Sequence, residues 1–349
     1  MTDELLAVDS LRTHIQTGDG IVRAVDGVSF TVNRGETVCL VGESGSGKTL
    51  TCDTITGLVD PPADVSGSVR FDGEALLSMD ERTLRTIRGN RIAYVFQHAQ
   101  NALDPVYTVG DQLIEAMTFH EDIGTEAATR RAISLLRSVG LSQPHARIDQ
   151  YPHELSDGMA QRVAMAIGLA AEPELLIADE PTSALDVLIQ ARLLDVLDEL
   201  RDNRDLAMLL VTHDLRVAAT LADRVVVLYG GTAVEQGPAD AVFDRPSHPY
   251  TQELIRSFTG DDDWRAATAE VPDHGCPFYR ECPLVADECR DGRPPLHAVA
   301  DSEDHRSACL YHDGDHDSSL VFDRIPSMDR DVMTVDAVNP AESGGESRE

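Results

Sequence analysis

The sequence is almost devoid of lysine and is short of positive charge altogether. Its 349 residues carry 29 lysine and arginine side chains against 61 acidic ones, a formal net charge of −32. Nucleic acids and anionic membrane surfaces are bound through cationic faces, so this balance argues against both as direct partners. The acidic excess also predicts adaptation to concentrated salt, where screening weakens self-repulsion. The alternative, a codon bias for arginine over lysine, leaves the carboxylate excess unexplained.

A signal peptide and long apolar runs are missing as well. The chain begins with the acidic sequence Met1-Thr2-Asp3-Glu4, and no apolar run approaches the roughly 18 residues that a membrane span needs. Aromatic residues make up only 5% of the chain, but the hydrophobic fraction of 42% indicates a globular protein. We therefore expect a soluble, cytoplasmic protein whose role at a membrane, if any, depends on partners that supply the spans.

The clearest local pattern is a glycine-rich segment between an apolar run at 38–41 and a helix-compatible stretch at 50–58. Its residues are Gly42, Glu43, Ser44, Gly45, Ser46, Gly47, Lys48 and Thr49. Strand, glycine-rich turn, Lys-Thr and helix form the context of a phosphate-binding P-loop. Backbone N–H groups can cradle phosphates there, Lys48 can reach the β- and γ-phosphates, and Thr49 can hold magnesium. Lys48 is the only lysine in the chain. The segment predicts binding of a nucleoside triphosphate rather than a plain Gly/Ser turn.

The remaining pattern predicts a mostly parallel α/β core. Residues 5–32 alternate and contain turns near 18–20 and 33–35, which indicates an antiparallel entry region, and 69–73 indicates another hairpin. Continuous apolar runs, typical of strands buried on both faces, alternate with helical stretches. The expected strands are 91–96, 175–178, 208–211 and 225–228, and the expected helices fall within 109–141, 159–171 and 187–200. Ligands of such a sheet bind at the carboxyl ends of its strands.

Five short elements follow the P-loop in a fixed order. They are Gln97 after a strand, the sequence Leu155-Ser156-Asp157-Gly158-Met159, the strand 175–178 with Asp179 and Glu180, the sequence Ser183-Ala184-Leu185-Asp186, and His213. In this order and spacing they resemble the Q-loop, signature, Walker B, D-loop and switch elements of ATP-binding cassette (ABC) ATPases. The resemblance extends from about residue 5 to residue 258.

This resemblance implies a P-loop NTPase fold of the ABC type. Its parts are an antiparallel β subdomain, a mostly parallel core sheet and a helical signature subdomain at about residues 98–170. Nucleotide sites of the family lie between two subunits, with the P-loop of one facing the signature of the other. One cassette per chain therefore implies a dimer, in which Ser156, Asp157, Gly158 and Met159 face the partner's nucleotide.

The resemblance also implies a role for each polar residue. Asp179 would hold magnesium together with Thr49, and Gln97 would sense the metal. Glu180 would polarise the attacking water, and His213 would bond the γ-phosphate. Each has a plainer interpretation when taken alone: Glu180 as a solvated carboxylate, Gln97 as a loop amide, and His213 as a histidine at a strand end.

Three further stretches resemble oligopeptide/dipeptide importers. They are residues 96–105, residues 151–156, and residues 243–251 with the sequence His248-Pro249-Tyr250-Thr251. This implies an ATPase subunit on the cytoplasmic face of the membrane, bound to two permease subunits that work with an extracytoplasmic substrate-binding protein. Nickel and oligosaccharide importers share these stretches and remain alternatives. A non-transport cassette ATPase is a further alternative, but the chain lacks the long coiled coil of DNA-repair members and the second cassette of ribosomal ones.

Two positions depart from the family pattern. Ile15 stands where the family has an aromatic residue near the adenine, so we expect weaker base stacking or stacking supplied elsewhere. Asp157 replaces the first glycine of the signature and places a carboxylate near the partner's γ-phosphate. Because a homodimer would carry this carboxylate at both sites, we expect a heterodimer with a second ABC ATPase.

The six cysteines fall into two groups. Cys39 and Cys52 lie in the P-loop strand and the following helix, and we expect them to be core packing. Cys276, Cys282, Cys289 and Cys309 cluster near the C-terminus, with a spacing too wide for a zinc ribbon. They resemble the cluster-binding extension of some dipeptide-importer ATPases, which implies a 4Fe-4S cluster. Zinc, and plain reduced thiols, remain alternatives.

Composition divides the chain into three parts. We expect a nucleotide-binding domain at 1–258, a cysteine-rich, loop-rich extension at 259–312, and an acidic, disordered tail at 313–349. The histidines near the cysteines, His297 and His305 among them, are expected to lie on the surface.

Overall fold

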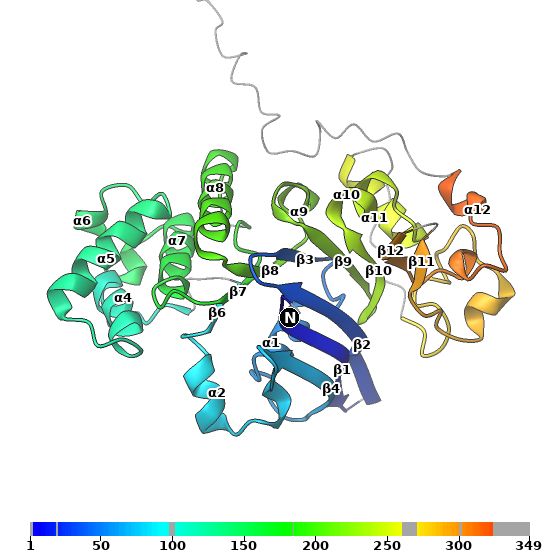
Figure 1. Cartoon of the computed structure of the whole chain (residues 1–349), viewed down its shortest axis with the longest axis horizontal. Coiled ribbons are helices and arrows are strands. Elements are labelled where there is room, and N and C mark those ends of the chain that lie inside the picture. The colour runs from blue at the N-terminus through cyan, green and yellow to red at the C-terminus, as the bar shows by residue number, and fades with distance from the viewer. Residues whose placement is uncertain are drawn as a thin grey trace, which may run out of the picture.

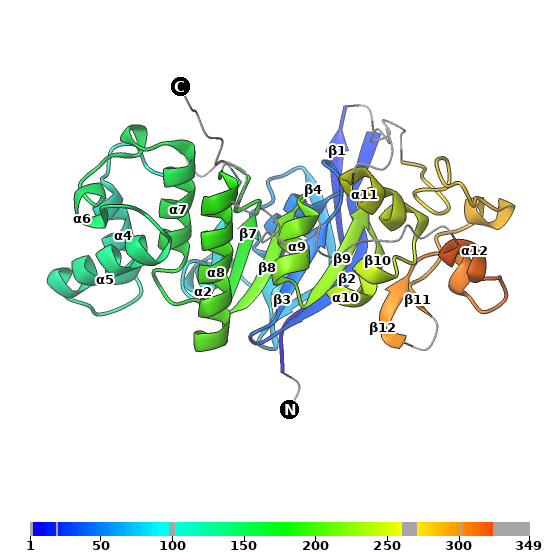
Figure 2. The same cartoon turned by 90° about the horizontal axis from the view of Figure 1, so that it is seen from above.

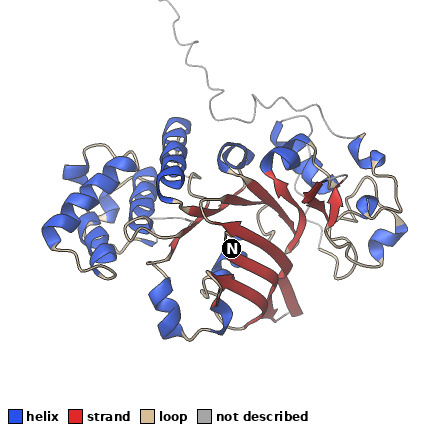
Figure 3. Ribbon diagram, viewed as in Figure 1, coloured by secondary structure: helices blue, strands red, loops and turns tan. Residues whose placement is uncertain are grey.

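A computed structural model of the chain describes residues 3–18, 20–97, 102–183, 185–259, 271–299 and 302–323. These residues form two β-sheets with helices around them (Figures 1 and 3). No helix within these ranges is long and apolar enough to cross a membrane.

The smaller sheet is antiparallel and is formed by the N-terminal part of the chain. Its order is β2 (Gly20–Asn33), β1 (Glu4–Thr17), β4 (Ala63–Phe71) and β5 (Glu74–Ala75). Apolar side chains of β1, such as Leu6, Val8 and Leu11, are buried, and a register shift between Val8 and Leu11 interrupts the alternation. The antiparallel entry region and the hairpin at 69–73 are therefore confirmed.

The larger sheet carries the P-loop. Its order is β11 (His297–Val299), β12 (Ser302–Ser307), β10 (Thr232–Pro238), β9 (Arg224–Tyr229), β3 (Thr37–Val41), β8 (Ala207–Thr212), β7 (Leu175–Asp179) and β6 (Ile92–Val95). The five strands from β9 to β6 are parallel. Every residue of β3, β7 and β8 is buried, as expected for strands covered on both faces. The parallel core is confirmed.

Helices cover both faces of this sheet. On one face lie α8 (Val187–Arg204) and α9 (Leu215–Leu221), which Figure 2 shows over β7 and β8. On the other face α1 (Lys48–Ile55) packs between the two sheets, since Cys52 and Ile55 share one apolar cluster with residues of both. Cys39 belongs to the other cluster, so the expectation that Cys39 and Cys52 are core packing is confirmed.

A group of helices projects beyond β6 and carries the signature sequence (Figure 1). It contains α4 (Val109–Thr118), α5 (Thr125–Ser138), α6 (Pro144–Arg147) and α7 (Asp157–Gly168), while the short α2 (Glu81–Ile87) lies before β6. A capping box between Thr108 and Asp111 fixes the start of α4. The helical region expected within 98–170 is present, although residues 98–101 lie outside the described ranges.

The C-terminal region continues the core sheet and contains more regular structure than expected. After β10 come α10 (Ala239–Asp244) and α11 (Pro249–Thr259), and β12 pairs antiparallel with both β10 and β11. The prediction that residues 259–312 are loop-rich therefore did not include the hairpin of β11 and β12. Its strand β12 has mostly exposed polar side chains, so it lacks the apolar alternation that signals a strand.

The expectation of disorder from residue 313 onwards is wrong for residues 313–323. They include α12 (Ser319–Phe322), in which Val321 is fully buried. Gln252 donates a side-chain hydrogen bond of 3.0 Å to the carbonyl of Val321, and the Arg245 guanidinium lies 3.8 Å from the centre of the Phe322 ring. Residues 324–349 lie outside the described part of the chain.

His305 also contradicts its sequence-based expectation. Its side chain is buried, and its Nε2 lies 2.7 Å from the carboxylate of Glu235, which is fully buried. His297 is only partly exposed. Burying a histidine beside a carboxylate costs little free energy, because the carboxylate supplies the hydrogen bond that water would otherwise make.

Candidate functional site

The P-loop connects β3 to α1, and the Lys48 side chain is buried inside it. Its Nζ donates to the carbonyls of Gly42 and Glu43, at 2.8 and 2.7 Å, and lies 3.3 Å from Oγ of Ser46. Burial lowers the pKa of Lys48, while the nearby carboxylates of Glu180 and Asp179 oppose the shift. The cation is thus desolvated at the start of a helix, where backbone N–H groups favour anions.

Two glycines of the loop are required by close backbone contacts. Gly47 has a φ of 99°, and a Cβ at this position would lie 2.4 Å from the carbonyl of Ala24. At Gly42 a Cβ would lie 2.2 Å from the carbonyl of Leu228. Gly45 has a φ of 82°, but a Cβ there would meet no atom within 4 Å. The loop is therefore held tightly against β2 and β9 at two of its glycines.

Glu180, His213 and Gln97 come together at the carboxyl ends of three neighbouring strands, β7, β8 and β6. The Nδ1 of His213 lies 2.8 Å from one Glu180 oxygen, and the amide of Gln97 donates to the other at 3.1 Å. Glu180 has a φ of 48°, which is uncommon for a residue with a side chain. The structure thus brings together three polar residues that are far apart in the sequence.

Asp179 is buried next to this group, and its environment suits a divalent cation. Burial raises its pKa, with further contributions from Glu180 and Asp53. The Thr49 hydroxyl and Lys48 lie close enough to oppose part of that rise. Among the residues that the structure describes, neither Asp179 oxygen has a hydrogen-bond partner of ordinary geometry. A buried, unpartnered carboxylate beside a hydroxyl matches the oxygen ligands that magnesium takes.

The signature sequence lies at the start of α7. Ser156 is the N-cap residue, but its side chain makes no capping hydrogen bond, and both Ser156 and Asp157 are exposed. In the D-loop, Asp186 caps α8 by accepting from the N–H of Ile189 at 3.1 Å, while Ala184 lies outside the described residues. The exposed start of α7 leaves a helix N-terminus available to a ligand on another chain.

Ile15 lies in β1, opposite Val22 of β2 and Ala63 of β4. Its side chain is only partly exposed. The described residues around it offer branched apolar side chains, with Val22 and Ile21 about half and two-thirds exposed. That Ile15 weakens stacking on the adenine, or that another residue supplies it, therefore stays a prediction.

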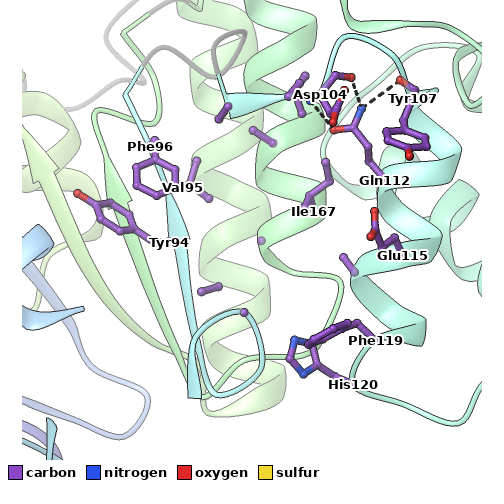
Figure 4. Close-up of a pocket in the computed structure, with 17 residues that line it drawn as sticks. Tyr94, Val95, Phe96, Asp104, Tyr107, Gln112, Glu115, Phe119, His120 and Ile167 are labelled. Carbon is purple, nitrogen blue, oxygen red and sulfur yellow. Dashed lines mark hydrogen bonds between the residues drawn. The ribbon is translucent and has the colours of Figure 1, made fainter. Parts of the chain in front are cut away.

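An apolar cavity of about 420 Å³ separates β6 from the helical region (Figure 4). Phe96, Tyr107 and Phe119 line it, and each of these aromatic side chains is at least 42% exposed. At its rim Gln112 donates to the carbonyls of Asp104 and Tyr107 and accepts from the N–H of Asp104. Exposed aromatic groups clustered around a hollow are typical of a protein-binding surface.

Two of the four C-terminal cysteines are joined by a backbone hydrogen bond of 2.8 Å, from the N–H of Cys276 to the carbonyl of Cys289. Burial raises the pKa of Cys309, and the thiols of Cys282, Cys276 and Cys289 raise it further. The Nε2 of His248 lies 3.9 Å from the Cys276 sulfur. Within the described ranges, however, no three His, Cys, Asp or Glu side chains are arranged so that they could hold a single metal ion.

One contact of the site was not expected from the sequence. The hydroxyl of Tyr250, in α11, accepts a 3.1 Å hydrogen bond from the backbone N–H of Glu43 in the P-loop. Tyr250 belongs to the sequence His248-Pro249-Tyr250-Thr251, which resembles importer ATPases but does not by itself indicate a contact with the P-loop.

Taken together, a P-loop on a parallel sheet, a strand-end carboxylate pair and a signature helix define a P-loop ATPase of the ATP-binding cassette class. The "ABC transporter" family model matches residues 25–183. Among solved structures, a dimeric ATP-binding cassette in a post-hydrolysis state with ADP and phosphate is similar, with a TM-score of 0.63 and 28% identity. It covers 67% of this chain and 99% of its own.

The C-terminal region narrows this class further. Residues 234–289 match the family model "Oligopeptide/dipeptide transporter, C-terminal region". The dipeptide transport ATP-binding protein DppD of Escherichia coli is 41% identical over 88% of this chain and 96% of its own length. The oligopeptide transport ATP-binding protein OppD of Mycobacterium tuberculosis is 45% identical over 88% of this chain, but over only 52% of that longer protein. The chain belongs to the oligopeptide/dipeptide transporter family of ABC ATPases.

Proposed function

We propose that this chain is the ATP-hydrolysing subunit of a peptide importer, bound through two permease subunits to the cytoplasmic face of the membrane. The observation that carries the proposal is the convergence of Glu180, His213 and Gln97 beside the P-loop. The likeness to named dipeptide and oligopeptide transport proteins supports peptides over nickel or oligosaccharides as the cargo.

In the proposed reaction each residue acts through its position. The P-loop N–H groups and Lys48 bind the phosphates, and Asp179 with Thr49 would hold a magnesium ion, which would supply positive charge against the phosphates. Glu180 accepts a proton from the attacking water, and His213, which is hydrogen-bonded to Glu180, orients that water toward the γ-phosphate. Gln97 links Glu180 to the segment that leads into the helical region.

The cavity next to Gln97 provides a place for the permease. It lies between β6, which leads into Gln97, and the helices α4 and α7 (Figure 4). A permease segment seated against Phe96 and Phe119 would therefore contact the route by which Gln97 senses nucleotide. An apolar docking segment suits these exposed rings. A substrate-binding protein on the other side of the membrane would deliver the peptide.

The test of the ATPase role uses two substitutions. Glu180→Gln should retain ATP binding but lower the hydrolysis rate by about two orders of magnitude or more, since the general base is lost. Lys48→Ala should weaken ATP binding itself. Both are measured with purified protein and its permeases in vesicles. Wild-type turnover by Glu180→Gln at saturating ATP would remove Glu180 from the proposed role.

We also propose that the partner ATPase is a different chain. The exposed carboxylate of Asp157, in the first turn of α7, opposes the favourable field of that helix for a γ-phosphate. If the partner is a different ATPase with an intact signature, only one of the two nucleotide sites of the dimer contains the repulsive carboxylate. Concentrated salt, predicted from the acidic composition, would screen part of the repulsion. Asp157→Gly in the reconstituted pair should raise the ATPase rate and reduce its salt dependence. If neither changes, the unequal-site proposal fails.

For the extension we propose a 4Fe-4S cluster held by Cys276, Cys282, Cys289 and Cys309. Two features favour it: the effect of the other three thiols on the pKa of Cys309, and a ring nitrogen of His248 next to the Cys276 sulfur. Bound there, the cluster would cross-link the loops of the extension. Protein purified without oxygen should contain about four iron and four sulfide per chain, and Cys282→Ser should remove the visible absorbance while ATP binding persists. Stoichiometric zinc without iron would contradict the proposal.

A further inference from the structure

The P-loop residue Glu43 is held from two sides. Its carbonyl accepts a hydrogen bond of 2.7 Å from Nζ of Lys48, which is part of the loop itself. Its N–H donates to the Tyr250 hydroxyl at 3.1 Å, from a residue 207 positions further along the chain. The carbonyl of Gly42, which shares a peptide group with the Glu43 N–H, also accepts from Nζ of Lys48, at 2.8 Å. The Gly42–Glu43 peptide is therefore fixed by one partner inside the loop and one outside it.

Tyr250 itself is fixed by its surroundings. Its side chain is completely buried, and its ring lies 4.5 Å from that of Tyr229 and 5.5 Å from that of Phe278. Its backbone N–H donates to Nδ1 of His248 at 3.1 Å, and the N–H of His248 is in turn bound by the carboxylate of Glu235. Burial raises the pKa of Tyr250, so the phenol stays neutral. A ring packed on both sides can aim its hydroxyl with little freedom.

We propose that Tyr250 is a positioning residue for nucleotide binding, which makes the C-terminal region part of the nucleotide site. The hydroxyl satisfies a backbone donor that the turn of the P-loop leaves without a helix or strand partner, and so fixes the orientation of the Gly42–Glu43 peptide. Tyr250 lies outside the cassette match at residues 25–183 and inside the second match at 234–289. This inference rests on the proposed ATP-binding role of the P-loop.

The test removes one tyrosine hydroxyl at a time from the packed rings of Tyr250 and Tyr229. Tyr250→Phe keeps the ring but removes the acceptor for Glu43, so this part-buried N–H loses its partner. The KM for ATP should rise about three- to tenfold, the effect of one net hydrogen bond. The kcat should change less than twofold, because the Tyr250 hydroxyl bonds to the P-loop backbone rather than to the Glu180–His213 pair. The matched control is Tyr229→Phe, which removes a hydroxyl whose hydrogen-bond partner is Glu281, at 3.3 Å, rather than the P-loop backbone; its KM should stay at the wild-type value.

Three outcomes are informative. If Lys48→Ala abolishes ATP binding but Tyr250→Phe leaves KM unchanged, the positioning role is refuted and the proposed function stands. If Lys48→Ala also binds ATP normally, the proposed function fails. Hydrogen exchange of the Glu43 amide in the wild-type protein needs no variant to fold: it should be slowed at least about a hundredfold relative to an unstructured peptide. Exchange at the unstructured rate would overturn the proposal.

Discussion

The buried carboxylate of Glu235 offers a sharp test of how the C-terminal region is attached. Glu235 is completely buried in β10 and accepts three hydrogen bonds. The donors are the N–H groups of Ser247 and His248, at 2.7 and 2.8 Å, and the Nε2 of His305 at 2.7 Å. One side chain thus joins β10 to the start of α11 and to the neighbouring strand β12.

Replacing Glu235 by alanine should be strongly destabilising. The substitution leaves three buried donors without an acceptor, at about 1–3 kcal/mol each when no relaxation occurs. Because water can enter near this end of the sheet and satisfy some of these donors, we expect the lower part of that range, a total loss of about 3–5 kcal/mol in the free energy of unfolding.

The assay is urea unfolding followed by circular dichroism, with an exposed ion pair as control. Glu126 and Arg130 lie 2.6 Å apart on α5, so their separation resembles that of Glu235 and His305, but both are largely exposed. Exposed pairs of this kind contribute little. Glu126→Ala should therefore leave the unfolding midpoint unchanged. If Glu235→Ala lowered stability no more than Glu126→Ala, the argument from burial would be refuted.

Two further expectations concern the P-loop and pH. Gly47→Ala should abolish ATP binding because its Cβ would meet the Ala24 carbonyl at 2.4 Å, whereas Gly45→Ala, also at positive φ but in open space, should retain most of it; equilibrium binding of ATP compares them. Burial lowers the pKa of His312 from its ordinary 6.5. The folded chain then binds fewer protons at this group than the unfolded chain, so stability is complete above pH 6.5 and falls as the pH drops. His312→Gln should lose less stability than the wild type between pH 7 and pH 5 in urea unfolding, and an equal loss would contradict the shift.

The core of the site could be predicted because its signals are local. The P-loop reads as glycines followed by Lys48 and Thr49, and each strand that ends at a polar residue is a continuous apolar run. Parallel strands place their carboxyl ends at one edge of the sheet, which brings the residues after each strand to the same side. The contact of Glu180 with His213 also depends on β7 lying next to β8, an order that the sequence does not predict.

The C-terminal region could not be predicted in the same way because its contacts are distant in sequence. His305 lies on a polar strand, and only its pairing with Glu235, 70 residues earlier, explains its burial. The order in residues 313–323 depends on Val321 and on contacts with α11, which a short acidic stretch does not reveal. Local composition indicates which residues of this region are polar, but not which distant residues bury them.

If Tyr250 fixes the P-loop, packing changes inside the extension should reach the nucleotide. Phe278, between Cys276 and Cys282 in sequence, is buried against the Tyr250 ring. Phe278→Leu keeps an apolar side chain but loses the edge-to-face contact, so the Tyr250 ring is held less firmly and the KM for ATP should rise about twofold or more. Val321→Ala is the control, since Val321 is equally buried in the same region but contacts the Gln252 side of α11. Both variants should lose some stability in urea, but only Phe278→Leu should change KM. Equal KM values in the two variants would mean that the extension supports the fold without acting on the nucleotide site.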